Sequence, residues 1–174
     1  MIRVSVILGT FNSAAFIKRT VESVLSQEGN GIDFEIELLI IDDCSNDNTV
    51  DILRSMGLQP ISTQFPSGGP NKGRNIGLQT ATGEYIALID HDDTWHPEKI
   101  KTQLSVADRA PIITTGYQLT DSSRKTNSSA GTGEPEVRFF DKNVTFLDRL
   151  ARRKRGQPVY MSTIMISREL SSIL

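Results

Sequence analysis

The chain has 174 residues, of which 37% are hydrophobic and 23% are charged, and its formal net charge is −2. These values predict one globular domain and exclude a disordered chain, and the lack of a basic excess argues against a dedicated nucleic-acid binder. A single cysteine, Cys44, excludes a disulfide framework and a thiolate-rich metal site. The apolar stretches fall short of the roughly 18–20 residues that cross a bilayer, and the N-terminus does not resemble a secretory signal. We therefore expect a cytoplasmic protein.

Apolar strand patterns and amphipathic helix patterns alternate from the N-terminus to about residue 108. The predicted strands cover 4–8, 34–41, 60–64 and 84–90, and the predicted helices cover 13–27, 49–56, 71–80 and 97–108. Asn12 or Ser13 is expected to cap the first helix. The buried stripe of that helix is expected to contain Ile17, Val21, Val24 and Leu25. This alternation is typical of βαβ units, so we predict an α/β sandwich with a mostly parallel sheet.

The pattern is looser after Pro111. We expect strands at 112–119, 137–140 and 160–166, helices at 144–151 and from 168 onward, and a mobile surface loop at 121–136. A run of cations lies between residues 149 and 155: Arg149, Arg152, Arg153, Lys154 and Arg155. Such a run is usually solvated, but it could also contact anionic lipid or a diphosphate.

Acidic residues follow the fourth predicted strand, in LIDHDDTW (88–95). Ligands bind parallel sheets at this edge, outside the carboxyl ends of the strands. Asp90, Asp92 and Asp93 would repel one another unless a cation or protons intervene, and oxygen ligands favour Mg²⁺ or Mn²⁺. We therefore predict a divalent metal that bridges the protein and a diphosphate. The alternative is that these acids only form a turn and cap the next helix.

A second acidic group follows the second strand, in IIDDCSNDNT (40–49). We expect Asp43, just beyond the strand, to accept a hydrogen bond from a base or a ribose. Ser45, Asn46 and Asp47 are expected instead to cap the following helix, and Cys44 is expected to be packed.

A third segment, PSGGPNKGRN (66–75), combines glycines with Lys72 and Arg74, a composition that suits a phosphate. Its spacing matches neither of the common glycine-rich phosphate motifs, and Lys72 could equally be a solvated surface cation. Phe11 could stack on a base or belong to the core. His91 lies inside the fourth-strand cluster, but with only His96 nearby it does not indicate a zinc site.

Four segments in this order resemble the nucleotide-binding half of family 2 glycosyltransferases: VSVILGTFNSAAFIKRTVESVLSQ, LLIIDDCSNDNT, GRNIGLQTATGEYIALIDHDD and TWHPEKI. The resemblance spans about residues 2–104, and YMSTIMISREL resembles the strand that precedes the acceptor side in that family. It implies the GT-A fold, a Rossmann-like three-layer sandwich. It also implies transfer of a sugar from a nucleotide diphosphate with inversion at the anomeric carbon.

The resemblance assigns roles to individual residues. Thr10 and Phe11 would lie at the nucleobase, and Asp43 would accept a hydrogen bond from uracil or another base. Arg74 and Asn75 match the family's Arg-Asn dipeptide near the nucleotide. The predicted donor site contains Thr10, Phe11, Asn12, Asp43, Lys72, Arg74, Asn75, Asp90 and His91, and the predicted ligands of Mn²⁺ or Mg²⁺ are Asp92 and Asp90, which match the D-x-D motif.

The chain departs from the family pattern in three places. Gly9 stands where Pro or Thr is more usual, and His91 occupies the middle of D-x-D, where small residues are commoner. The family's catalytic base, an acid in a Glu-Asp pair, normally follows near the position of Leu174, and the sequence contains no such pair. We therefore expect a fragment whose base lies beyond Leu174, with Asp93 as the base only if the chain is complete.

We predict a single domain over 1–174, with a nucleotide-binding half at 1–108 and the start of an acceptor-side half at 109–174. The expected function is metal-dependent transfer of a sugar from a nucleotide-diphosphate donor to a hydroxyl of a glycan, lipid or other acceptor. The expected nucleotide of the donor is UDP. Peripheral contact with the inner face of a membrane is also expected.

Three alternatives stay open at this point. The chain could be a non-catalytic nucleotide-sugar-binding fragment. It could be a sugar nucleotidyltransferase, which would need a basic, glycine-rich loop straight after the first strand. It could also be a phosphoacceptor receiver domain, which would need a Lys after the fifth strand.

Overall fold

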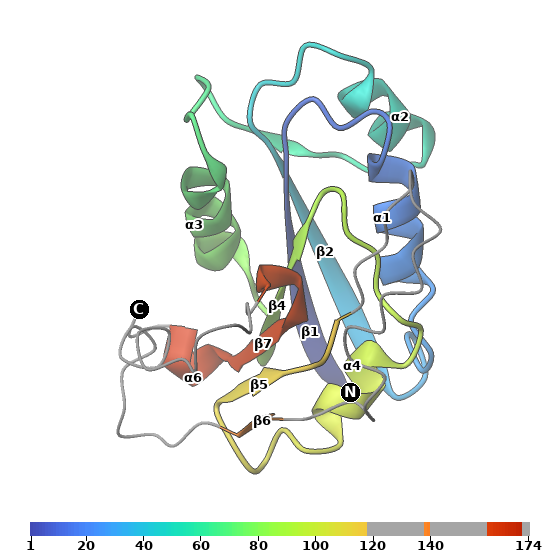
Figure 1. The fold of residues 1–174 in the computed structure, drawn as a ribbon, viewed down its shortest axis with the longest axis vertical. Coiled ribbons are helices and arrows are strands. Elements are labelled where there is room, and N and C mark those ends of the chain that lie inside the picture. Colours follow the sequence, from blue (N-terminus) through green and yellow to red (C-terminus); the bar gives the residue numbers. More distant parts are fainter. Residues whose placement is uncertain (118–137, 140–159, 172–174) are drawn as a thin grey trace.

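The computed structural model describes residues 1–117, 138–139 and 160–171, and its strands form one seven-stranded sheet (Figure 1). The strands are β1 (Ile2–Thr10), β2 (Phe34–Asp42), β3 (Ile61–Ser62), β4 (Tyr85–Asp90), β5 (Ile112–Thr114), β6 (Arg138–Phe139) and β7 (Ile164–Ser167). The helices are α1 (Ile17–Leu25), α2 (Thr49–Ser55), α3 (Pro70–Thr80), α4 (Lys99–Leu104) and α6 (Arg168–Ser171), and a 3₁₀ turn, η1 (Met161–Thr163), precedes β7.

The sheet order is β3-β2-β1-β4-β7-β5-β6. The first four of these strands are parallel, and β7 runs antiparallel to both of its neighbours, β4 and β5. The predicted mostly parallel sheet is therefore confirmed. The insertion of β7 between β4 and β5 was not predicted, and it means that both predicted halves of the chain contribute to one sheet.

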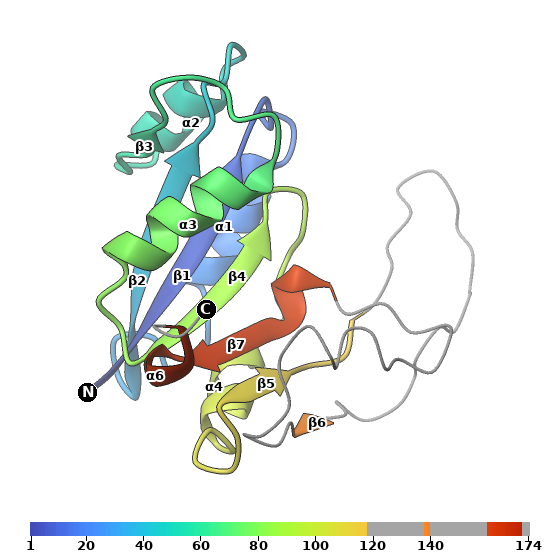
Figure 2. The same ribbon diagram turned by 90° about the vertical axis from the view of Figure 1, so that its left-hand side faces the viewer.

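Helices cover both faces of the sheet, as the two views show for α1 and α3 (Figures 1 and 2). In β1, Val4, Val6 and Leu8 belong to the core on the side of α1, α2 and α4, whereas Ile7 belongs to the core on the side of α3 and α6. Alternate side chains of a strand point to opposite faces, so an uninterrupted apolar run is what a doubly covered strand requires. The three-layer sandwich is confirmed.

Helix α3 lies unusually close to β1 because Gly77 has no side chain. A Cβ at Gly77 would lie 2.9 Å from Ile7 Cγ1 and closer still to Ile7 Cγ2. One turn earlier, a Cβ at Gly73 would lie 3.5 Å from Ile41 Cγ2, which is an ordinary contact. This packing fixes the height of α3 above the sheet, and so fixes Arg74 at the end of β4.

The start of α1 differs from the prediction. The helix begins at Ile17, and no side-chain capping bond is present at its N-cap residue, Phe16. Asn12 has a left-handed φ of 47° and Ser13 accepts the N–H groups of Phe16 and Ile17 through its backbone carbonyl, so a turn occupies the expected first helical turn. The prediction that Leu25 completes the buried stripe is also wrong, because Leu25 is 42% exposed.

Several predictions fall wholly or largely outside the described residues: the loop at 121–136, the helix at 144–151 and the run of cations at 149–155. The strand predicted at 112–119 is shorter and ends at Thr114, and Tyr160 precedes a 3₁₀ turn instead of lying in the last strand. Within residues 1–117, 138–139 and 160–171, no helix is long and apolar enough to span a membrane.

The close approach of α3 to β1 predicts opposite effects for two glycine substitutions. Gly73→Ala should raise the free energy of unfolding by up to about 1 kcal/mol, because alanine favours the helix and meets only an ordinary contact. Gly77→Ala should lower it by about 1–2 kcal/mol, because the clash with the branched Ile7 outweighs the gain in helix propensity. Urea denaturation measures both. Equal effects would contradict the close approach.

Candidate functional site

The carboxyl ends of β2, β1 and β4 meet at one edge of the sheet. The register pairs Thr10 with Asp42 across β1 and β2, and Gly9 with Asp90 across β1 and β4. The predicted convergence of the acidic groups at one edge is therefore confirmed, although β1 lies between the two acidic strands. Two strand spacings of about 4.8 Å put the two groups roughly 10 Å apart.

The loop after β4 carries the predicted metal ligands. Asp90 Oδ1 accepts a hydrogen bond from Arg74 on α3 at 2.7 Å, and the Arg74 side chain is 19% exposed. Asp92 is exposed, and its carboxylate makes no hydrogen bond or ion pair with residues 1–117, 138–139 or 160–171. His91 is half-buried, and its carbonyl is engaged by α1. The loop therefore presents one paired and one unpaired carboxylate.

Helix α1 holds this loop through its backbone. Thr20, which is fully buried, has its Oγ1 2.9 Å from the carbonyl of His91 and 2.8 Å from that of Asp93. Arg19 donates to the carbonyl of Asp92 at 3.1 Å. Because these contacts use carbonyl groups, they restrain the loop without occupying the Asp92 carboxylate.

Asp43 is held at the other acidic strand end by the loop that follows β3. Its two oxygens accept the Ser67 N–H at 3.0 Å, the Ser67 hydroxyl at 2.8 Å and the Thr63 hydroxyl at 2.8 Å. Burial acts to raise the pKa of the Asp43 carboxyl, but the hydrogen bonds from Ser67 and Thr63, together with the charge of Lys72, lower it below its ordinary value. Asp43 is therefore an ionised acceptor at neutral pH.

The loops after β1 and β2 brace each other. Asn12 donates its N–H to Ser45 Oγ at 2.9 Å, and its Oδ1 accepts the N–H of Asn46 at 2.9 Å. Of the residues predicted to cap α2, Asp47 reaches its start, where it accepts the Thr49 N–H at 2.9 Å, but the N-cap residue is Asn48 and makes no side-chain capping bond. The capping role predicted for Ser45 and Asn46 is wrong, because the Ser45 hydroxyl accepts the Asn12 N–H and neither side chain bonds to α2 within the described residues.

Phe11 projects from this braced region and is 47% exposed, so the core interpretation of Phe11 is wrong. Thr10 is buried and its hydroxyl bonds to that of Ser13. Cys44 is half-buried with its thiol 3.0 Å from the carbonyl of Thr63, as expected for a packed cysteine. Asp42 is 2% exposed, and its Oδ1 has no hydrogen-bond partner within the described part of the chain.

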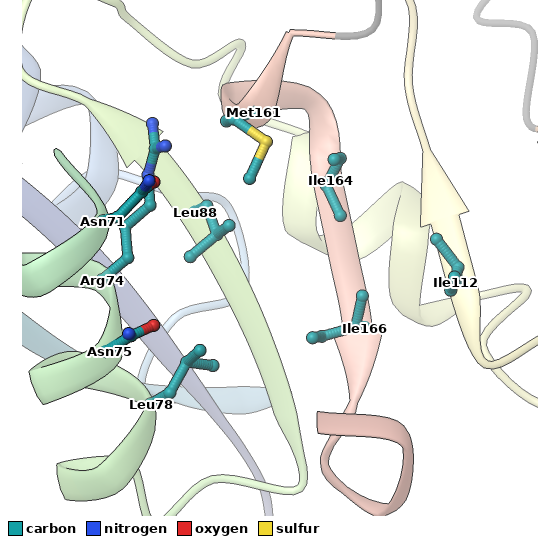
Figure 3. A pocket seen from close by; sticks show the side chains of 9 residues that line it. All are labelled: Asn71, Arg74, Asn75, Leu78, Leu88, Ile112, Met161, Ile164 and Ile166. Carbon is teal, nitrogen blue, oxygen red and sulfur yellow. The ribbon is translucent and has the colours of Figure 1, made fainter. Parts of the chain in front are cut away.

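A pocket of about 410 Å³ lies between α3 and the strands beyond it (Figure 3). Its polar wall comes from Asn71, Arg74 and Asn75, and its apolar lining is Leu78, Leu88, Ile112, Met161, Ile164 and Ile166. The Arg74 side chain also pairs with Asp90, so it joins the pocket to the rim, the edge of the sheet where the carboxyl ends of β2, β1 and β4 meet. Asn75 lines this pocket together with Arg74. Lys72 is exposed, and its Nζ lies 3.5 Å from the carbonyl of Phe65.

Lys99 lies at the start of α4 and is buried. Its Nζ donates to Gln103 Oε1 at 2.7 Å and lies 4.1 Å from the centre of the Trp95 ring. Burial lowers the pKa of Lys99 to about 7. Trp95 belongs to the segment that follows the acidic loop (residues 90–93), so the contact between Lys99 and Trp95 supports that segment.

The donor set suits a hard divalent cation. Among the residues that the structure describes, no group of three or more His, Cys, Asp or Glu side chains could hold a metal ion. Asp92, with Asp90 beside it, offers carboxylate oxygens only. Mg²⁺ is commonly held by one or two carboxylates, with water and substrate phosphates as its other ligands, and this arrangement fits that pattern.

The family model of glycosyl transferase family 2 matches residues 5–171. The chain belongs to this family. The family 2 resemblance noted in the sequence is therefore confirmed.

Named relatives agree with this membership. The chain is 32% identical to the putative teichuronic acid biosynthesis glycosyltransferase TuaG of Bacillus subtilis, over 95% of this chain and 62% of that protein. It is 33% identical to the poly(ribitol-phosphate) β-N-acetylglucosaminyltransferase TarS of Staphylococcus aureus, over 62% of this chain and 19% of that protein. It spans 42% of an uncharacterized Nostoc glycosyltransferase, at 31% identity over 78% of this chain.

Solved structures show the same fold. The TarS fragment 1–349 in complex with UDP-GlcNAc superposes with a TM-score of 0.60 and 29% identity, over 71% of this chain and 38% of that chain. A mannosyltransferase from Pyrobaculum calidifontis in complex with GDP-Man and Mn²⁺ superposes with a TM-score of 0.61 over 67% of this chain and 36% of that chain. At 23% identity the second likeness supports the fold alone. The GT-A fold of this family 2 chain is confirmed.

Sequence reasoning missed the residues that hold the site together. Ser67 and Thr63 bind Asp43, Thr20 binds the acidic loop, and Ser162 reaches that loop from η1. Ser67 could have been inferred from the glycine-rich loop around it. No local sequence pattern marks Thr20 or Ser162.

The lowered pKa of Asp43 predicts a loss of stability in acid. A carboxyl whose folded pKa lies below its unfolded value stabilises fully above the unfolded value of about 4, and the contribution is lost as the pH falls from there through the lower folded pKa. The pKa values of Asp47 and Glu37 are also lowered against the effect of burial, by hydrogen bonds from Thr49 and Ala14 to Asp47 and from Ser5 and Thr82 to Glu37. The free energy of unfolding, measured in urea at several pH values, should therefore decline below pH 5.

Two variants isolate the share of Asp43. Asp43→Asn should show a shallower decline than the wild type, because the amide does not titrate. Glu22→Gln, at an exposed position on α1 with only a 3.9 Å contact to Lys18, should follow the wild-type curve. If Asp43→Asn kept the wild-type slope, the assignment of the pKa shift to Asp43 would be wrong.

Proposed function

We propose that this chain is the donor-binding part of a glycosyltransferase that transfers a sugar from a UDP-linked donor to an acceptor hydroxyl, with a divalent cation at the β4 end. The observation that carries the proposal is the shared rim of β2, β1 and β4, where an ionised Asp43 and the Asp90–Asp92 loop lie on either side of β1. Family membership and the UDP complexes of TarS support the choice of donor.

The separation of the two acidic strand ends suits an elongated ligand. A nucleoside diphosphate has a base at one end and two phosphates at the other, so it can reach both ends of the rim. At the β2 end, Asp43 accepts an N–H of the base, and the exposed Phe11 lies in the loop beside it, where an aromatic ring can stack on a base. Thr10 and Asn12 hold this end in shape through the braced loops.

At the β4 end, Arg74 supplies positive charge to the diphosphate. The Asp90 carboxylate orients its guanidinium at 2.7 Å, and charge-assisted contacts of this kind are the strong ones in phosphate recognition. Asn75, on the same helix, faces the pocket beside it, and the exposed Lys72 adds a more distant charge. His91 lies between the two acids of the loop and is half-buried, close to where the phosphates would bind.

Asp92, with Asp90 beside it, would hold Mn²⁺ or Mg²⁺. When bound there, such an ion supplies Lewis-acid stabilisation of the negative charge that grows on the departing diphosphate. Asp90 would then serve both this ion and the Arg74 guanidinium, with which it pairs.

An inverting transfer also requires a base on the far side of the sugar, at hydrogen-bond distance from the acceptor hydroxyl. Asp93 Oδ2 already accepts the Ser162 hydroxyl, and we assign Asp93 to holding the loop; we assign no residue to the base. A second candidate function is a nucleotide-sugar-binding unit without turnover of its own. Release of UDP from a UDP-sugar in the presence of acceptor would exclude that second function.

Titration calorimetry with UDP tests the proposal. We expect UDP to bind at least about tenfold more tightly with Mn²⁺ than with a chelator, and Asp92→Asn to remove most of that difference, because one carboxylate ligand is lost. Asp51→Asn, at an exposed acid on α2, is the control and should leave the difference intact. Equal UDP binding with and without metal in the wild type would contradict the metal assignment.

A charge-removal variant tests the diphosphate end separately. Arg74→Ala should weaken UDP binding about tenfold to a hundredfold, the range for losing a charge-assisted hydrogen bond. Arg54→Ala on α2 removes the same charge from an exposed side chain whose nearest acid, Asp51, is 3.9 Å away, and should change the affinity less than about twofold. Equal effects of the two variants would place the diphosphate elsewhere.

A further inference from the structure

The segment that precedes β7 reaches the acidic loop through one serine. Ser162, in η1, is 7% exposed. Its Oγ accepts the backbone N–H of Asp90 at 3.0 Å and donates to Asp93 Oδ2 at 2.5 Å. Its carbonyl accepts the indole N–H of Trp95 at 2.9 Å. One residue therefore bonds to the start of the acidic loop at Asp90, to Asp93 within it, and to Trp95 in the segment that follows it.

The rest of the loop is held from the opposite side. Thr20 bonds to the carbonyls of His91 and Asp93, and Arg19 bonds to that of Asp92. Between them, α1 and η1 engage the loop backbone and the Asp93 carboxylate. Within the described residues, the Asp92 carboxylate is the acid of the loop that keeps no partner.

The 3₁₀ turn that carries Ser162 is itself anchored in the core. Gln103 of α4, which is fully buried, donates to the carbonyl of Thr163 at 3.0 Å and accepts from Lys99. In addition, β7 pairs directly with β4, the strand that leads into the loop. Ser162 is therefore held in place independently of the acids that it contacts.

We propose that Ser162 is a positioning residue for the metal-binding loop. By pairing with Asp93 it turns that carboxylate away from its neighbours, and by holding the Asp90 N–H it sets the direction in which Asp90 and Asp92 present their oxygens. This proposal rests on the proposed function, since it concerns the same metal and diphosphate site. It makes the metal response of nucleotide binding depend on a serine about 70 residues further along the chain.

The test compares UDP affinity with Mn²⁺ and with a chelator in three variants of the chain. Ser162→Ala should reduce the gain from Mn²⁺ by about tenfold and leave metal-free binding unchanged. Ser162→Thr keeps the hydroxyl and should retain the gain to within about twofold. Thr163→Val is the matched control, because it removes a buried hydroxyl in the same turn that donates to Tyr160 and not to the loop; it should keep the gain even where it lowers the melting temperature.

Each outcome bears on a different proposal. If wild-type UDP binding does not respond to Mn²⁺, the metal assignment fails and the role of Ser162 fails with it. If the wild type responds and Ser162→Ala responds equally, only the role of Ser162 is overturned, and the same holds if Thr163→Val loses as much as Ser162→Ala. Should Ser162→Ala not fold, Ser162→Cys, which keeps the volume but is a weak donor, takes its place with the same expected loss.

Discussion

The mutual repulsion of the carboxylates at the end of β4 is the constraint on which the site depends. Three acids within four residues would push a free loop open. The fold prevents this by giving two of them different partners, Arg74 for Asp90 and Ser162 for Asp93, and by holding the loop carbonyls from α1. Asp92 is then left facing solvent with its charge unneutralised. The arrangement that stabilises the loop is thus the same one that would hold the proposed cation.

The two acidic strand ends are chemically distinct even though they look alike in the sequence. Asp43 is surrounded by hydrogen-bond donors from the loop after β3, so it acts as a fixed, ionised acceptor. Asp90 pairs with the Arg74 guanidinium, and Asp92 faces solvent. Because β1 lies between the two acidic strand ends, each end keeps its own set of partners. The first is suited to recognising a flat ring with an N–H, and the second is suited to phosphate and metal.

The sequence predicted the parts of the fold that depend on local periodicity. The apolar runs of β1 and β2, the short helix α2 and the helix after the glycine-rich loop all form where the patterns indicated. The position of β7 could not be predicted, because antiparallel insertion between β4 and β5 depends on long-range pairing. The contacts of Thr20 and Ser162 were missed for the same reason, since each partner lies about 70 residues away.

The insertion of β7 has a consequence for the order of assembly. Strands β1, β2, β3 and β4 can pair as soon as they leave the ribosome, but β4 pairs with Ser167 only after some eighty further residues have emerged. Closing so long a loop is entropically costly and slow. A nascent chain therefore carries a nearly finished β2 end of the site while the β4 end still lacks a lateral support. Ligand present during synthesis would meet the two ends at different times.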